Sequence, residues 1–310
     1  MNRNLIGICG PTASGKTAVA VELCRRISGE VVSADSMQVY RGMDILSAKP
    51  SAEEMGGIQH HLIGCVEPTR KYNASAYREE ANKVISDIRA RGNVPVLCGG
   101  TGLYIDALIR GMRLSEKADE ALRDELKAIA ARENGPELLH EMLKKVDPES
   151  AEKYPAGDVR RVIRSIEIYR LTGMTRARQE EIDARTPNSY DACLFALRWP
   201  RETLYRRIDA RVDEMISRGL INEVSALMQE GENAHPTAVQ AIGYKEIACA
   251  LRGDCAMSDA IIRMKTATRN YAKRQMTWFQ RDPSIRWIDA QGKTCSEIVD
   301  EIVNLLPEGL

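Results

Sequence analysis

The residues most able to do chemistry lie near the start of the chain, in a glycine-rich stretch that ends in lysine and threonine. This stretch consists of Gly10, Pro11, Thr12, Ala13, Ser14, Gly15, Lys16 and Thr17. It fits the phosphate-binding pattern of Gly, four residues, and Gly-Lys-Ser/Thr. Such a loop turns backbone N–H groups toward an anion, and Lys16 adds a full positive charge. We expect a di- or triphosphate here, with Mg²⁺ on the hydroxyl of Thr17.

Asp35 is the next candidate, because it directly follows a second strand-like run at 30–34. It could ligate Mg²⁺, act as a general base on an acceptor, or only cap a turn. No Asp follows the strand-like run 93–98, where a motor or switch ATPase would carry a second metal-binding carboxylate. Glycines surround Thr101 there instead, and this threonine either places a hydroxyl at a helix start or forms a plain turn.

Basic residues recur at helical spacing in three places. They are Arg160, Arg161 and Arg164, then Arg206, Arg207 and Arg211, and then Lys265, Arg269 and Lys273. The chain as a whole balances 44 basic against 44 acidic residues, but 263–281 has six Lys or Arg and no acid. One such set is usually solvated surface. Because three such sets accompany a phosphate site, both interpretations remain: the sets form solvated surface, or they bind a polyanionic partner.

The elements that must position these residues follow from the hydrophobic pattern. Strand-like runs at 5–9, 30–34, 60–66, 93–98, 193–197 and 285–289 alternate with amphipathic helices. This alternation predicts an α/β fold like that of P-loop NTPases, a parallel sheet flanked by helices, with ligand groups at the carboxyl ends of the strands. Residues 115–185 are charged and helical without a convincing strand. We therefore expect a core of 1–114 and 186–310, interrupted by an all-helical insertion domain.

Composition excludes several classes of protein. The 310 residues are 44% hydrophobic and 28% charged, which is typical of a globular protein. No apolar run reaches the length of a membrane span, and the first residues do not resemble a signal peptide. Eight scattered cysteines without a Cys-x-x-Cys pair indicate thiols in a reducing compartment, so we expect a cytoplasmic protein. The four histidines, 60, 61, 140 and 235, show no zinc-binding spacing.

Seven further stretches accompany the glycine-rich loop in a specific order. They are 35–45, 49–50, 60–62, 99–104, 160–164 with Glu167, 241–246 and 269–279. Together they resemble the tRNA dimethylallyltransferase (tRNA isopentenyltransferase) family, in its compact bacterial form, over nearly the whole chain. Gln280 departs from the family, which has arginine there, so position 280 is not expected to be a basic contact.

The resemblance implies transfer of a dimethylallyl group from dimethylallyl diphosphate to N6 of adenosine at tRNA position 37. Asp35 would be the general base, Thr101 would line the reaction channel, and the loop at 10–17 would hold the diphosphate and Mg²⁺. The insertion domain would grip the anticodon stem-loop, and a monomer without membrane contact is expected. The tRNA contacts implied are Asp35, Ser36, Met37, Gln38, Thr101, Arg123, Arg160, Arg161, Val162, Ile163, Arg164, Arg207, Arg211, Arg269, Lys273 and Arg274.

Two other enzymes fit part of the sequence. A small-molecule kinase would place ATP in the loop and use Asp35 on an acceptor hydroxyl, but it gives the basic insert no purpose. Prenylation of a free adenine nucleotide would use the same chemistry without tRNA, and the insert argues against it as well. The sequence does not say which tRNAs are modified or whether ATP binds.

Overall fold

The computed structural model describes residues 4–111, 119–231 and 237–307. The chain divides into two compact units, one of residues 1–109 and 190–310 and the other of residues 110–189. The predicted start of the insert, residue 115, and His235 lie outside the described residues. The predicted end, residue 185, closes the last helix of the second unit.

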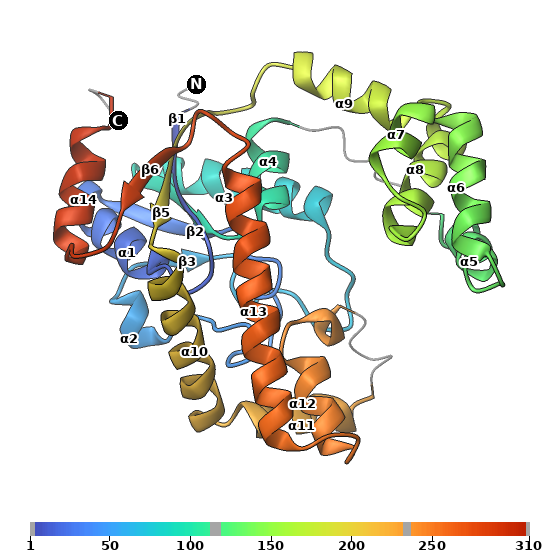
Figure 1. The fold of residues 1–310 in the computed structure, drawn as a ribbon. Helices are drawn as coiled ribbons and strands as arrows, with labels where there is room; N and C mark the ends of the chain where they lie inside the picture. Colours follow the sequence, from blue (N-terminus) through green and yellow to red (C-terminus); the bar gives the residue numbers. More distant parts are fainter. Residues whose placement is uncertain (1–3, 112–118, 232–236, 308–310) are drawn as a thin grey trace. The chain divides into compact units, whose positions relative to one another are not determined.

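The first unit is built on one sheet of parallel strands, as predicted (Figure 1). Its strands are β1 (Asn4–Cys9), β2 (Gly29–Ser33), β3 (His60–His61), β4 (Val94–Gly99), β5 (Asp191–Arg198) and β6 (Arg286–Asp289), in the order β3-β2-β4-β1-β5-β6. The central strands are apolar and buried, because helices cover them. Cys98 is in register with Ser33, and Gly99 is in register with Cys9. The segments that follow β1, β2 and β4 therefore leave the sheet at one edge.

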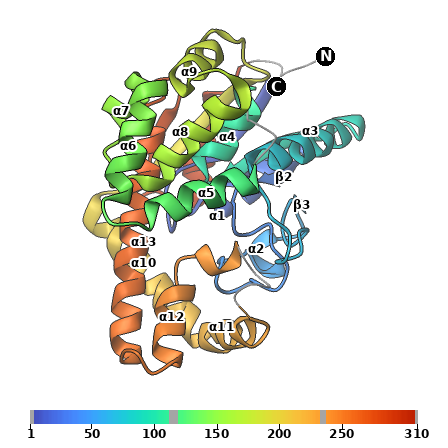
Figure 2. The same cartoon turned by 90° about the vertical axis from the view of Figure 1, so that its right-hand side faces the viewer.

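Helices alternate with the strands of the first unit, as the hydrophobic pattern predicted. They are α1 (Lys16–Ile27), α2 (Ala52–Met55), α3 (Ala74–Ala90), α4 (Gly102–Ile109), α10 (Arg201–Ser217), α11 (Leu220–Gln229), α12 (Tyr244–Leu251), α13 (Met257–Phe279) and α14 (Cys295–Asn304), with a 3₁₀ turn, η2, at Ala238–Gln240. Helix α12 packs against both α11 and α13, and the three lie together in both views (Figure 1, Figure 2). No helix in the described part of the chain is long and apolar enough to cross a membrane.

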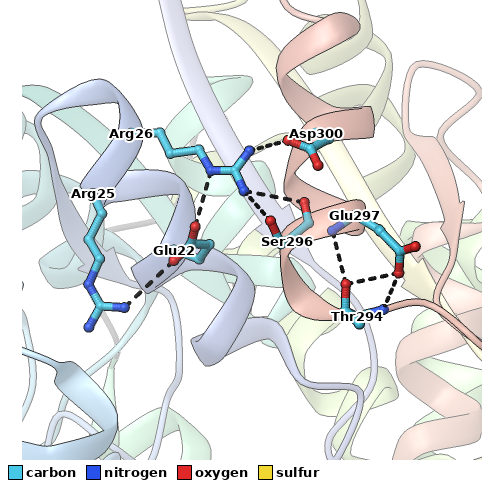
Figure 3. Close-up of polar contacts among 7 residues, drawn as sticks. All are labelled: Glu22, Arg25, Arg26, Thr294, Ser296, Glu297 and Asp300. Atoms are coloured by element: carbon cyan, nitrogen blue, oxygen red, sulfur yellow. Dashed lines mark hydrogen bonds and ion pairs between the residues drawn. The ribbon is translucent and has the colours of Figure 1, made fainter.

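Helix α14 is joined to α1 by a polar network around Arg26 (Figure 3). The Arg26 guanidinium lies 3.1 Å from Glu22 and 2.6 Å from the Ser296 hydroxyl, and it also pairs with Asp300. Exposed ion pairs of this kind contribute about 0–1 kcal/mol each. The apolar contact beneath them, in which Leu23 and Val299 are both fully buried, therefore supplies most of the attachment.

The second unit is helical, with no strand among its described residues. Its helices are α5 (Glu120–Ala130), α6 (Gly135–Val146), α7 (Pro148–Lys153), α8 (Val159–Thr172) and α9 (Arg176–Arg185). Its core is one apolar cluster that includes Leu126, Leu139, Leu143 and Val162. The unit therefore has a hydrophobic core of its own, as a separate domain requires.

A buried carboxylate at the start of β2 should make stability depend on pH. Glu30 is 5% exposed and accepts hydrogen bonds from Arg91, Asn93 and His61 at 2.7, 2.6 and 2.6 Å. Burial alone would raise the pKa of Glu30, but these hydrogen bonds outweigh it and lower the pKa to about 2. Because the folded pKa is depressed, the stabilisation is present above the ordinary value of 4.5 and is lost as the pH falls toward 2.

We expect Glu30→Gln to lower the free energy of unfolding at pH 7 by about 2 kcal/mol, since three charge-assisted partners lose their anion. The variant should also flatten the decline in stability between pH 5 and pH 3. Urea denaturation at several pH values measures both effects. An equally steep decline in Glu30→Gln would show that other groups govern the acid sensitivity.

Candidate active site

The phosphate loop connects β1 to α1 and is built on left-handed backbone turns. Gly10 has φ +131° and Gly15 has φ +93°, conformations that glycine adopts at little cost. Lys16 begins α1, and its Nζ donates to the carbonyl of Pro11 at 2.7 Å. The buried Ser14 hydroxyl has no hydrogen-bond partner among the described residues. An unpaired buried hydroxyl within such a loop is what an anion-binding site provides for its ligand.

Two arginines of α10 lie directly on this loop. Arg207 donates from Nε to the carbonyl of Ala13 at 2.8 Å and stacks 4.4 Å above the ring of Trp199. Arg211 donates to the Thr12 hydroxyl at 3.4 Å. Sequence reasoning placed both arginines among the tRNA contacts. That role stays a prediction; the structure brings both arginines to the phosphate loop, where two guanidinium groups and Lys16 would surround an anion.

Asp35 and Thr101 meet at the carboxyl ends of β2 and β4, as the topology predicted. Asp35 Oδ1 accepts from the N–H groups of Met37 and Gln38 at 2.9 and 3.3 Å, so the residue does cap a turn. Its Oδ2 has no hydrogen bond within the described part of the chain and remains available to a substrate. Thr101 Oγ1 accepts from the N–H of Ser36 at 3.0 Å, which joins the two segments.

The glycines around Thr101 are required by close approach. A Cβ on Gly99 would lie 2.2 Å from the carbonyl oxygen of Ala34, and one on Gly102 would lie 2.2 Å from Trp278. Neither distance is possible between non-bonded atoms. The glycines therefore let Ala34, directly after β2, and Trp278 of α13 approach the turn that carries Thr101.

Gln275 of α13 joins the phosphate loop to this turn, and sequence reasoning did not identify it. Its Oε1 accepts from the N–H of Thr12 at 2.8 Å, and its Nε2 donates to the carbonyl of Gly100 at 2.9 Å. The side chain is 5% exposed. A buried amide with both ends paired holds its neighbours in one arrangement.

A cavity of about 640 Å³ lies between these groups, and all residues that line it belong to the first unit. The phosphate loop, Asp35, Ser36, Gln38 and Arg274 contribute polar groups. Apolar side chains form the rest of the lining, among them Leu46, Val212, Met215, Ile242 and Met264. Tyr271 also lines the cavity; burial and the nearby Asp35 charge raise the pKa of its hydroxyl, which stays protonated. The cavity can thus hold a ligand with an anionic end and an apolar part.

The position of Lys16 gives anion binding a pH dependence. Burial in the loop lowers the pKa of Lys16 from 10.5 to about 8, and Arg211 acts in the same direction. As the pH rises through 8, the ammonium loses its proton and the loop loses positive charge. We expect the affinity for inorganic diphosphate to fall about tenfold between pH 7 and pH 9. Calorimetric titration tests this, and Lys16→Met should bind weakly with little change over the same interval.

The predicted tRNA contacts of the second unit are only partly on its surface. Val162 and Ile163 are 0% and 8% exposed and belong to the apolar core. Helix α8 turns both side chains inward, so a contact of Val162 or Ile163 with tRNA would have to involve the backbone, and their place among the tRNA contacts stays a prediction. Arg160 and Arg161 are exposed, and Arg161 pairs with Asp158 at 2.6 Å.

Arg123 and Arg164 share one buried carboxylate. They lie 2.8 and 2.6 Å from the oxygens of Glu167, which is completely buried, while both arginines remain partly exposed. Glu167 therefore orients two guanidinium groups at the surface of the second unit and leaves some of their donors to solvent.

The basic residues of α13 also have different surroundings. Lys265 pairs with Asp213 at 2.6 Å and Arg269 with Asp209 at 3.3 Å, both on α10, so these two cations are largely neutralised. Lys273 is exposed. The spacing of these basic residues in the sequence could not show that Asp209 and Asp213 of α10 would face them.

A phosphate loop after β1, a carboxylate after β2 and a partly apolar cavity on a parallel sheet define a group-transfer α/β protein that binds an anionic substrate. The IPP transferase family model matches residues 38–282, and the chain belongs to this family. It is 42% identical over 304 residues to a tRNA dimethylallyltransferase of Carboxydothermus hydrogenoformans, covering 98% of this chain and 97% of the relative. Identity to that of Pelotomaculum thermopropionicum is 44% over 300 residues, covering 96% and 95%.

Solved structures agree with these relatives. The full-length tRNA isopentenylpyrophosphate transferase of Bacillus halodurans superposes with a TM-score of 0.73 at 41% identity, covering 98% of this chain and 95% of that one. A eukaryotic dimethylallyltransferase described as acting on tRNA gives a TM-score of 0.79 at 30% identity, covering 99% and 81%. The predicted family and fold class are confirmed.

Proposed function

We propose that this protein transfers a dimethylallyl group from dimethylallyl diphosphate to N6 of adenosine at position 37 of tRNA. The main observation behind the proposal is that one cavity extends from the phosphate loop to Asp35 and has a partly apolar lining. The names of the relatives indicate that the group transferred is dimethylallyl and that the acceptor is a tRNA. Free thiols at all eight cysteines fit a reducing cytoplasm.

The donor diphosphate would lie in the phosphate loop. Lys16, Arg207 and Arg211 would bind its oxygens, and the unpaired hydroxyl of Ser14 would complete the cradle. The residues fit Mg²⁺ as well, because Thr17 lines the cavity beside Lys16 and offers a hydroxyl oxygen. Mg²⁺ commonly takes few protein ligands and several phosphate oxygens, and it would neutralise charge on the leaving diphosphate.

The acceptor adenine would lie against the segment 35–38. Its N6 nitrogen attacks C1 of the dimethylallyl group, the bond from C1 to the diphosphate oxygen breaks, and the N6 proton moves to Asp35 Oδ2. Diphosphate leaves with the bonding electron pair. Thr101, Ser36 and Gln38 would position the base, which must leave the helical stack of the RNA to enter an enclosed cavity.

The tRNA would be held mainly by the exposed basic residues of the second unit. Arg160 and Arg161 are exposed, and the two arginines on Glu167 keep donors at the surface. Contacts between arginine and phosphate release counterions, so binding should weaken steeply with salt. Replacing Arg160, Arg161 and Arg164 together should flatten that salt dependence.

One assay tests the function against its alternatives. The protein is incubated with Mg²⁺, labelled dimethylallyl diphosphate and either unmodified tRNA or AMP. Label in tRNA alone supports the proposal, whereas label in AMP would indicate the free-nucleotide enzyme. Phosphoryl transfer from ATP to a small molecule, without prenyl transfer, would indicate a kinase.

A further inference from the structure

The segment 44–48 forms part of the cavity wall. A carboxylate from a helix far away in the sequence accepts hydrogen bonds from its backbone. Glu223 of α11 accepts from the N–H groups of Asp44 and Ile45 through Oε2, at 3.0 and 2.8 Å. Its Oε1 accepts from the N–H of Leu46 at 2.8 Å. Three consecutive N–H groups thus surround one anion, and charge-assisted hydrogen bonds of this kind are strong.

This segment has a conformation that needs support. Ala48 has φ +49°, a left-handed backbone conformation that alanine adopts only at a cost. Two backbone hydrogen bonds close the turn, from Ala48 N–H to Ile45 and from Lys49 N–H to Asp44, at 2.9 and 3.0 Å. Strain of this sort persists only where the surroundings fix the chain. The carboxylate of Glu223 is bound to the first three residues of that turn.

The carbonyl of Ala48 links both sides of the site. It accepts from Gln38 Nε2 at 3.1 Å and from Arg211 Nη2 at 3.2 Å. Gln38 belongs to the segment of the proposed acceptor base, and Arg211 also contacts the phosphate loop through Thr12. A shift of this one carbonyl would therefore disturb groups on the acceptor side and on the donor side together.

We propose that Glu223 is a positioning residue for the transfer reaction. It fixes the turn at 44–48 so that the Ala48 carbonyl orients Gln38 and Arg211 in the cavity. Leu46, Ser47 and Ala48 line the cavity and Glu223 does not, so Glu223 acts through the turn. This inference rests on the proposed function for its kinetic consequence, while its structural part can be measured without any activity.

The first test is amide hydrogen exchange of wild type and Glu223→Gln. Glutamine keeps the size of the side chain, but its NH₂ group would face a backbone N–H, so at least one of the three hydrogen bonds is lost. We expect exchange in the peptide that contains 44–46 to accelerate at least tenfold, with the thermal midpoint nearly unchanged. Glu223→Asp keeps two acceptor oxygens and should recover part of the protection. Unchanged exchange in Glu223→Gln would overturn the inference.

The second test is steady-state transfer by the same variants. Glu223→Gln should lower kcat about tenfold or more, while the dissociation constant for tRNA stays within about twofold, because the second unit is intact. Glu202→Gln, an exposed carboxylate on α10, is the matched control and should behave as wild type. A loosened turn with unchanged kcat would overturn the positioning role. Absence of transfer in wild type would instead refute the proposed function and leave the exchange result valid.

Discussion

Replacing Asp35 with asparagine should lower the rate of dimethylallyl transfer by about 10²–10⁴-fold, the usual contribution of a general base. Asparagine keeps an oxygen that can accept from the N–H groups of Met37 and Gln38, so the turn should persist. What the variant loses is the basic Oδ2, which has no hydrogen bond among the described residues. The proton on N6 then has no acceptor as the new carbon–nitrogen bond forms.

Single-turnover measurement with saturating donor isolates this step from product release. The affinity for tRNA, measured by filter binding, should change less than about threefold, because one neutralised carboxylate removes no phosphate contact. Asp87→Asn, on the exposed face of α3, serves as the control and should retain full activity. If Asp35→Asn instead weakens tRNA binding with an unchanged single-turnover rate, Asp35 holds the acceptor and is not its base.

The fold could be predicted from the sequence because buried parallel strands and amphipathic helices leave periodic patterns. Five of the six predicted strands lie within two residues of their expected bounds, whereas the run 60–66 forms a strand only at His60–His61. Residues 110–189, which contain the helical insert, form a compact unit of their own. Helix α2 was missed, since four residues are too few to show a period. Helix α12 begins only at Tyr244, because Gly243 before it has φ +104°, outside the helical range, and a Cβ at that position would meet Met264 and Leu46.

The site could be predicted only where its residues follow one another in the chain. The phosphate loop, Asp35 and Thr101 stand at strand ends, so spacing and topology bring them together. Glu223 and Gln275 act across contacts between segments more than 170 residues apart, and no local pattern encodes such a contact. Spacing likewise could not show that Lys265 would meet an acid of α10, because that depends on helix packing.

Gly100→Ala should lower kcat/KM by about tenfold to a hundredfold by displacing Gln275. A Cβ at this position would lie 2.2 Å from Gln275 Nε2. The amide must rotate or withdraw, which breaks its hydrogen bonds to Gly100 and to the N–H of Thr12. Thr12 lies in the phosphate loop, so the loop and the turn carrying Thr101 lose their connection. Displacements of about 1 Å within a site commonly cost this much in rate.

A double-mutant cycle decides whether the effect passes through Gln275. Gln275→Ala alone removes the same two hydrogen bonds and makes room for the new methyl group, so Gly100→Ala/Gln275→Ala should be no slower than Gln275→Ala. Gly157→Ala, at a position with nothing within 4 Å, is the control for glycine replacement itself. Additive losses in the cycle would mean that Gly100 acts on the backbone of the turn independently of Gln275. Strong non-additivity would identify the buried amide as the connection between the diphosphate site and the acceptor site.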